Sequence, residues 1–339
     1  MIFACHIGLY WSANFFIDEK NLSFTCTHTP LPLPVFSKKI FLDSIVETAL
    51  LSGPKETATE KYIISSNPDI LTKTTFEDSL KELVMPCPYI WIGDKRIYTP
   101  EGVCELRINE TDFFNYFFLE QSSQQADNAW QNRLLYGPKT PTNAYDISLE
   151  NAVSFAKIKF AINSSYSKVL SGADKFIISG SYPFYYGGIT RLMLAVLNAF
   201  NMPGIWRVCF DELDTVSCLA TLACCNKELA NSLLLKYPYP TTVTTLIVPG
   251  ATGGEIDFGL GKNQSFDFKN AGVFFVPISE QDKVKVIIKG KKNATFEVSG
   301  GTYGLVIDAR VRPLSGFMSK SYAFKETEQL KRVLETKVI

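Results

Sequence analysis

Short apolar runs alternate with polar turn residues over the first thirty positions of the chain. Apolar runs at 2–5 and 13–17 are followed by a stretch at 22–26 in which apolar and polar side chains alternate. Alternation with a period of two is typical of a strand that has one buried face. The pattern predicts three strands joined by tight turns, which together occupy residues 2–29.

Further along the chain, helical and strand-like periods alternate until about residue 240. The expected elements in the first part are a helix at 38–52, a strand at 62–64, a hairpin at 89–98 and an exposed polar segment at 122–132. They are followed by a long helix capped by Asp146 or Ser148, a strand at 176–178, an amphipathic helix at 189–200 and a closely packed helix of small residues at 216–225. Residues 241–312 then change to short β-type runs separated by glycines, and the tail from 324 has a helical composition. This change predicts a boundary near residue 240.

Charge and cysteine content exclude several classes of protein. Lys plus Arg and Asp plus Glu number 34 each, so the formal net charge is 0, and a strongly basic nucleic-acid binder is excluded as a description of the whole chain. No run of about 18 uncharged apolar residues occurs, so a membrane-spanning helix is not expected. The eight cysteines form no Cys-x-x-Cys pair, and the two histidines, His6 and His28, do not complete a zinc pattern. Reduced thiols and a cytoplasmic location are therefore expected, and a Ser-His or Cys-His hydrolase is disfavoured.

Two charged patterns near the end of the chain have competing interpretations. Lysines at 283, 285, 289, 291 and 292 are interspersed with Val and Ile, which favours the solvated face of a hairpin over an RNA-binding patch. Asp308, Arg310 and Arg312 alternate along one predicted strand. An intramolecular ion pair that holds this strand against the core is favoured over recognition of a carboxylate or phosphate.

The segment at 296–314 reads FEVSGGTYGLVIDARVRPL. It resembles the V-E-G-G-x-x-G-L-V-I-D-A-R-G-R-P-L signature at the end of the MutL-like glutamate mutase L family, with Val311 where glycine is usual. Three further stretches, at 5–13, 146–152 and 177–181, resemble the opening loop of the family, the helix after its Pro-rich joint and the strand before its Thr-Gly-Gly loop.

The resemblance implies an α/β protein of the actin-like ATPase superfamily, which also contains the sugar kinases and Hsp70. The fold would be an actin-like (ribonuclease H-like) core with a small β-rich C-terminal module. The expected divisions are a shortened first actin-like subdomain at 1–140, a second actin-like subdomain at 141–240, the β-rich C-terminal module at 241–315 and a helical tail at 316–339.

Proteins of this superfamily hold the nucleotide phosphates with two hairpin loops, each carrying an Asp that organises Mg²⁺ or the attacking water. In this sequence His6 stands at the position of the first carboxylate, and no second Asp-x-Gly-Gly loop precedes residue 140. The first loop is therefore either an altered phosphate loop or, as we favour, an ordinary hairpin. Residues 65–69 are the candidate remnant of the second loop. No catalytic residue and no metal-binding residue is assigned.

Weak binding of ATP with Mg²⁺ is the only cofactor expectation. The candidate nucleotide contacts are Gly8 in the first loop and Ser179, Gly180 and Ser181 after the strand at 176–178. A glycine after a strand lets backbone N–H groups approach a ligand closely, although the same glycine can serve an ordinary strand-to-helix turn. The Asp-x-Gly-like loop at 250–259 is expected to belong to a β extension rather than to the nucleotide cleft.

The favoured hypothesis is a non-catalytic or weakly ATP-binding, chaperone-like protein that acts on a protein partner. The resemblance implies an adenosylcobalamin-dependent mutase as the candidate partner. Binding to nucleic acid or to a membrane is not expected. The alternative is an active ATPase or sugar-kinase-like enzyme whose Mg²⁺ carboxylates come from other positions, such as Asp69 or Asp211. A third hypothesis is a structural assembly subunit, as some actin-like proteins are.

Overall fold

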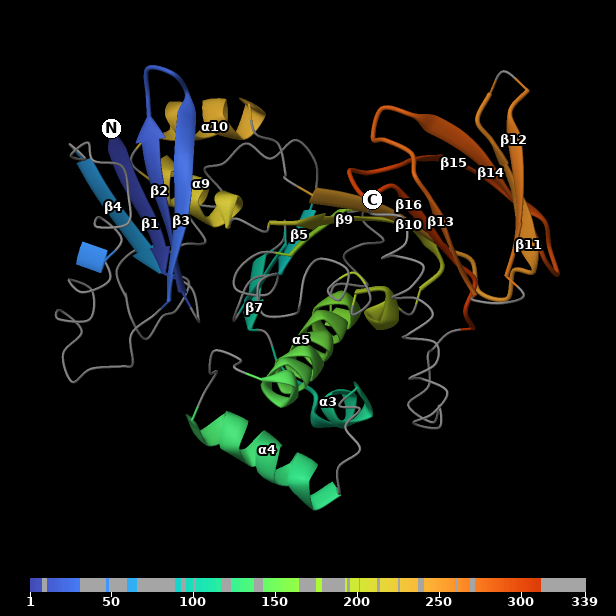
Figure 1. Ribbon diagram of the computed structural model, residues 1–339, viewed down its shortest axis with the longest axis horizontal. Coiled ribbons are helices and arrows are strands. Elements are labelled where there is room, and N and C mark those ends of the chain that lie inside the picture. Colours follow the sequence, from blue (N-terminus) through green and yellow to red (C-terminus); the bar gives the residue numbers. More distant parts are fainter. Residues whose placement is uncertain are drawn as a thin grey trace.

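Figure 1 shows the computed structural model, a mixed α/β chain whose described strands form three β-sheets. The structure describes residues 1–7, 11–30, 47–48, 60–65, 89–92, 96–99, 102–105, 107–116, 123–136, 143–164, 175–178, 193, 196–200, 202–211, 214–224, 226–236, 241–259, 261–268 and 272–311. Apart from a helical pair at 47–48, the helix predicted at 38–52 lies outside these residues, as does the tail from 324.

The first sheet is built from the alternating segments at the start of the chain. Its strands are β1 (Ile2–Ile7), β2 (Trp11–Asp18), β3 (Ser23–Pro30) and β4 (Glu60–Ser65). Their order is β3-β2-β1-β4, in which β1 to β3 form an antiparallel meander and β4 is parallel to β1. The three strands predicted for 2–29 and the strand predicted at 62–64 are confirmed.

The second sheet contains the same arrangement a second time. Its strands are β5 (Tyr89–Ile92), β6 (Arg96–Thr99), β7 (Gly102–Glu105), β8 (Lys175–Ile178), β9 (Gly204–Phe210), β10 (Thr241–Ile247), β13 (Val273–Val276) and β16 (Leu305–Asp308), in the order β13-β16-β10-β9-β8-β5-β6-β7. Strands β5 to β7 form an antiparallel meander, and β8 is parallel to β5. The run β7-β6-β5-β8 thus repeats β3-β2-β1-β4 in order and direction. The predicted hairpin at 89–98 and strand at 176–178 are confirmed.

The third sheet is antiparallel and lies on the opposite side of Figure 1 from the first. It consists of β11 (Gly253–Asp257), β12 (Asn263–Asp267), β14 (Lys283–Lys289) and β15 (Ala294–Ser299), in the order β12-β11-β14-β15. Along β14, Val284, Val286 and Ile288 are buried, whereas the lysines are exposed, as the alternation predicts. The buried face shares one hydrophobic cluster with Leu246 of β10 and Leu305 of β16, which attaches this sheet to the second.

Three helices follow the β5–β7 meander: α3 (Glu110–Tyr116), α4 (Ser123–Tyr136) and α5 (Ala144–Ser164). The segment predicted to be exposed forms α4 and buries Ala129 and Trp130. The Trp130 ring lies 4.5 Å from the Phe113 ring of α3. The other side chains described in α4, at 124–128 and 131–133, are mostly polar and exposed, so the sequence period of the helix does not reveal this short contact face.

The helix predicted to begin at Asp146 or Ser148 is confirmed as α5, but the predicted cap is wrong. Asn143 Oδ1 accepts a hydrogen bond from the Asp146 N–H at 2.9 Å. Asparagine just before the first turn is among the best capping residues, because its side chain reaches the N–H groups that lack an intrahelical partner.

Helices α9 (Thr215–Ala223) and α10 (Lys227–Lys236) pack against the first sheet. Every residue of α9 is buried, which its small side chains permit. The surrounding cluster joins Ile2 and Ala4 of β1 to Ile177 of β8 and Cys209 of β9. Helix α9 therefore lies in a core that the first and second sheets share.

The ion pair predicted near the end of the β-rich region is confirmed. Arg310 Nη2 lies 2.7 Å from Asp308 Oδ2, and both side chains are buried. Arg310 Nη1 also donates to Asn198 Oδ1 at 2.8 Å, which holds the end of β16 against the helical residues at 196–199. Arg312 lies outside the described residues.

Sheet membership crosses the domain boundaries expected from the sequence. Strands β5 to β7, from the range 1–140, join the sheet of β8 and β9 from 141–240. Strands β10, β13 and β16, from 241–315, extend that same sheet, and only β11, β12, β14 and β15 form a sheet of their own. The change of composition near residue 240 marks the start of β10 rather than the start of a new layer.

Candidate functional site

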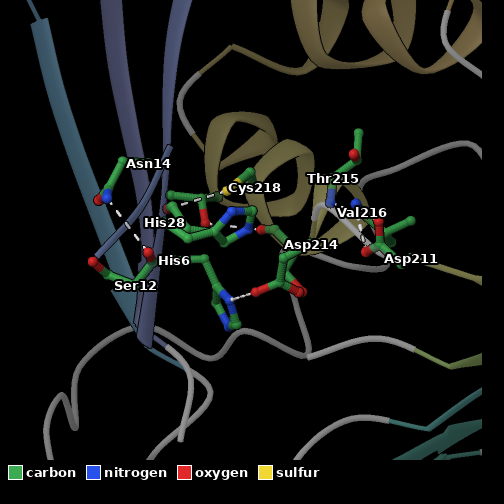
Figure 2. Close-up of polar contacts among 12 residues, drawn as sticks. His6, Ser12, Asn14, His28, Asp211, Asp214, Thr215, Val216 and Cys218 are labelled. Carbon is green, nitrogen blue, oxygen red and sulfur yellow. Dashed lines mark hydrogen bonds and ion pairs between the residues drawn. The ribbon is translucent and has the colours of Figure 1, made fainter. Parts of the chain in front are cut away.

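The carboxyl end of β1 and the residues after β9 meet at the start of α9 (Figure 2). His6 alternates along β1 with Ile2 and Ala4, so it lies on the face of the first sheet that α9 covers. Asp211 and Asp214 lie in the connection between β9 and α9. Carboxyl ends of parallel strands are where α/β sheets bind ligands. The sequence analysis expects the first phosphate loop at this end of β1.

His6 and Asp214 face each other in the interior. Nδ1 of His6 lies 2.7 Å from Oδ2 of Asp214, and each side chain is only 1% exposed. The hydroxyl of Ser217 donates to the other carboxylate oxygen, Oδ1, at 2.7 Å. Asp214 has a φ of 57°, in the left-handed region that Asp and Asn tolerate better than most residues. This pair links the first sheet to α9.

Asp211 caps helix α9. Its Oδ1 accepts a hydrogen bond from the N–H of Thr215 at 2.6 Å, and its Oδ2 accepts one from the N–H of Val216 at 2.9 Å. Both N–H groups belong to the first turn, which has no intrahelical partners, and a carboxylate there also interacts favourably with the helix dipole. The Asp211 N–H donates to the carbonyl of Ile178 at 2.9 Å, so the same residue ties α9 to the end of β8.

The two carboxylates are poorly suited to Mg²⁺. All four of their oxygens already accept a hydrogen bond or pair with His6. Mg²⁺ prefers oxygen ligands in near-octahedral geometry and usually keeps several waters, and two carboxylates that are each 1% exposed leave no room for such a shell. Within the described ranges, no three His, Cys, Asp or Glu side chains are arranged to hold a metal ion. The cluster is arranged to position α9.

The thiols near Asp214 are held in the protonated form. Burial, with a smaller contribution from the charge of the Asp214 carboxylate, raises the pKa of Cys5 to about 12. Burial, followed by the charge of Asp214, also raises the pKa of Cys26 and of Cys218. Because the thiolate is the nucleophilic form of cysteine, none of these residues is suited to nucleophilic catalysis at neutral pH. The cysteines whose side chains the structure describes, Cys5, Cys26, Cys209, Cys218 and Cys224, are free thiols, as the sequence predicts.

Alkylation of the native protein at pH 8 is expected to modify Cys224 at least about tenfold faster than Cys5. Cys224 is exposed, whereas a buried thiol of pKa about 12 is ionised in roughly one molecule in ten thousand at this pH. Peptide mass spectrometry after a short pulse of iodoacetamide measures both rates. The same pulse in concentrated guanidinium, without a reductant, is the control and should label all eight cysteines. Equal native rates would contradict the burial of Cys5.

The four predicted nucleotide contacts, Gly8, Ser179, Gly180 and Ser181, lie outside the described residues, as does Asp69. These assignments stay predictions. The sequence singled out His6 and Asp211 separately, without indicating that they lie in one cluster. Asp214 and Ser217 were not predicted. A capping signal was available, because Asp211 and Asp214 directly precede the helix of small residues.

No known protein family and no curated protein matches the chain. Among solved structures, the chain is similar to the activator of the 2-hydroxyisocaproyl-CoA dehydratase from Clostridium difficile, in a structure with bound ADPNP. The two share 8% sequence identity, the match covers 70% of this chain and 97% of the activator, and the TM-score is 0.35. Across the described helices, none is both long enough and apolar enough to cross a membrane.

Proposed function

We propose that the chain is an actin-like protein that does not hydrolyse ATP and acts by binding a partner protein. The repeated strand arrangement supports the actin-like core, because β7-β6-β5-β8 repeats β3-β2-β1-β4 in order and direction. Two tandem ribonuclease H-like units are the core that the sequence resemblance implies. On this proposal the two units divide between β4 and β5, and α9 returns from the second unit to the first.

The proposed absence of hydrolysis is supported by one observation: the carboxylates of Asp211 and Asp214 are both used inside the fold. Phosphoryl transfer depends on a positioned metal ion and a positioned nucleophile. Asp214 pairs with His6, and Asp211 caps α9, so neither carboxylate is presented to a nucleotide. The hydrogen bonds that Asp211 accepts from the first turn of α9 argue against the alternative in which Asp211 binds Mg²⁺. Asp69, the other residue of that alternative, has to be tested directly.

Membership of the glutamate mutase L family is a further part of the proposal, and it rests on the segment at 296–314. In that segment Gly300 and Gly301 allow close backbone packing, and Asp308 pairs with Arg310. These are internal roles, so the resemblance supports a shared C-terminal architecture rather than a shared catalytic centre. An adenosylcobalamin-dependent mutase remains the candidate partner. Affinity purification from the native organism, followed by mass spectrometry, tests this partner.

Phosphate release from Mg·ATP by the purified chain is expected to equal that of a protein-free control. Calorimetry on the same preparation measures whether nucleotide binds, because weak binding through backbone groups does not require the aspartates. Turnover near the median enzyme value of about 10 per second, abolished by Asp69→Asn or Asp211→Asn, would overturn the proposal. Asp267→Asn, an exposed carboxylate in β12, is the matched control and should leave the signal unchanged.

A further inference from the structure

A cleft of about 750 Å³ opens where the third sheet joins the second. The β13–β14 connection and the β15–β16 turn form its walls, and its lining includes Phe275, Ile278, Glu280, Gln281, Thr302 and Tyr303. A volume of this size is typical of small-molecule sites, at about 300–1,000 Å³. The cleft is lined by a different set of residues from the cluster of His6 and Asp214.

The cleft lies at the edge of the second sheet where β10 and β16 begin. Thr241, the first residue of β10, pairs with Phe210, the last residue of β9. Strand β16 is parallel to β10, and β8 is parallel to β9, so the start of β16 and the carboxyl ends of β8 and β9 share one edge.

Hydrogen bonds hold the two walls of the cleft together. The Gly300 N–H donates to the carbonyl of Ser279 at 3.0 Å, which joins the β15–β16 turn to the β13–β14 connection. The Thr242 hydroxyl donates to Oε1 of Glu280 and accepts a hydrogen bond from the Thr302 N–H at 3.0 Å. Thr242 is itself buried in β10. The Glu280 carboxylate is therefore held at a defined point of the wall before any ligand arrives.

The chemistry of the lining selects for positive charge. Glu280 is the only ionisable acid or base among the described lining residues apart from the Tyr303 phenol, and no described lysine or arginine lines the cleft. The nearby Asp282 adds a second negative charge and accepts a hydrogen bond from the Ser279 hydroxyl at 2.8 Å. Phe275 and Tyr303 contribute aromatic rings. A carboxylate repels anions and forms charge-assisted hydrogen bonds with cations, and aromatic faces attract cations as well.

We propose that this cleft binds a small organic cation. An ammonium or guanidinium group would pair with Glu280, and the apolar part of the ligand would lie against Phe275 and Tyr303. This inference goes beyond the proposed function, and its test does not depend on the outcome of the ATP experiment.

Three probes that share a phenyl ring and differ in charge test the proposal. Ligand-observed NMR titration should find that phenethylamine binds with a dissociation constant on the order of 1 mM, at least about tenfold tighter than 2-phenylethanol. 3-Phenylpropionate should not bind. Glu280→Gln removes the charge but keeps an acceptor for the Thr242 hydroxyl, so amine affinity should fall to that of the alcohol. Glu297→Gln, at an exposed position of β15, is the matched control and should change nothing.

A variant that is expected to bind the amine more tightly gives a result that misfolding cannot produce. Gln281→Glu adds a second carboxylate to the lining and should tighten phenethylamine binding by about threefold or more, without tightening the binding of 2-phenylethanol. Equal affinity for amine and alcohol, an amine preference that survives Glu280→Gln, or preferred binding of 3-phenylpropionate would each overturn the proposal.

Discussion

Asp214→Ala is expected to lower the free energy of unfolding by about 3–5 kcal/mol, since breaking a buried pair leaves the remaining partner uncompensated. His6 would lose the carboxylate that lies 2.7 Å from its Nδ1, and Ser217 would lose its acceptor, in a site where His6 is 1% exposed. Alanine would also have to adopt the φ of 57° at this position, which costs more for alanine than for aspartate. Urea unfolding at neutral pH, followed by circular dichroism, measures the change.

Two companion variants separate the pair from general effects of charge removal. Asp214→Asn keeps the size of the side chain and tolerates the left-handed backbone, but it replaces one acceptor oxygen with a donor. We expect it to cost about 1–3 kcal/mol. Glu297→Gln, at an exposed position of β15, should stay within about 0.5 kcal/mol of the parent protein. An Asp214→Ala variant as stable as the parent would show that the pair does not stabilise the join between the first sheet and α9.

Gly301→Ala is expected to lower the free energy of unfolding by about 2–3 kcal/mol, in the range of overpacked interiors. A Cβ atom at this position would lie 2.5 Å from the backbone oxygen of Thr242 and 2.7 Å from its carbonyl carbon. Backbone atoms of a central strand cannot move away as a flexible side chain can, so either β10 or the β15–β16 turn must shift. Gly301→Val should cost more, because its side chain is larger. Thermal and urea unfolding measure both effects.

Gly290→Ala is the matched control in the same part of the chain. The nearest atom to an added Cβ there is the Cα of Ala251 at 3.5 Å, an ordinary contact. Alanine in place of a compatible glycine reduces the entropy of the unfolded chain and typically stabilises a protein by about 0.4–1 kcal/mol. The two alanine variants should therefore shift stability in opposite directions. A stable Gly301→Ala protein would show that the close approach of the turn to β10 is not required.

The hydrophobic and polar pattern correctly predicted features that depend on residues close together in the sequence. The alternation at 22–26 predicts a strand that the structure confirms as part of β3, and the alternating lysines of β14 are exposed as expected. The ion pair between Asp308 and Arg310 is also local, because residues two apart on an extended chain lie on the same face. Capping was harder to predict, since Asn143, Asp146 and Ser148 are all good capping residues and the choice between them depends on where the first turn begins.

The contacts in the candidate site join residues that are far apart in the sequence or depend on backbone positions. His6 was identified as the residue that replaces a carboxylate, but its partner Asp214 lies 208 positions away. Asp211 was identified as a possible Mg²⁺ ligand. Its place shortly before the helix of small residues is a capping signal, but the hydrogen bonds that it accepts from the Thr215 and Val216 N–H groups are seen only in the structure. Neither contact has a repeating pattern that a single sequence could reveal.

Local sequence patterns predict strands β1 to β6 and β8, the buried character of α9, and the pairing of Asp308 with Arg310. These features depend on side chains within a few residues of one another, and hydrophobic periodicity records such neighbours directly. The tertiary fold is needed to show that β5 to β7 join β8 and β9, that β10, β13 and β16 extend that sheet, and that His6 pairs with Asp214. Pairing between distant segments costs loop-closure entropy, which packing across the whole fold must offset. A hydrophobic period in the sequence reports only on neighbouring residues, so it does not indicate which distant segments pair.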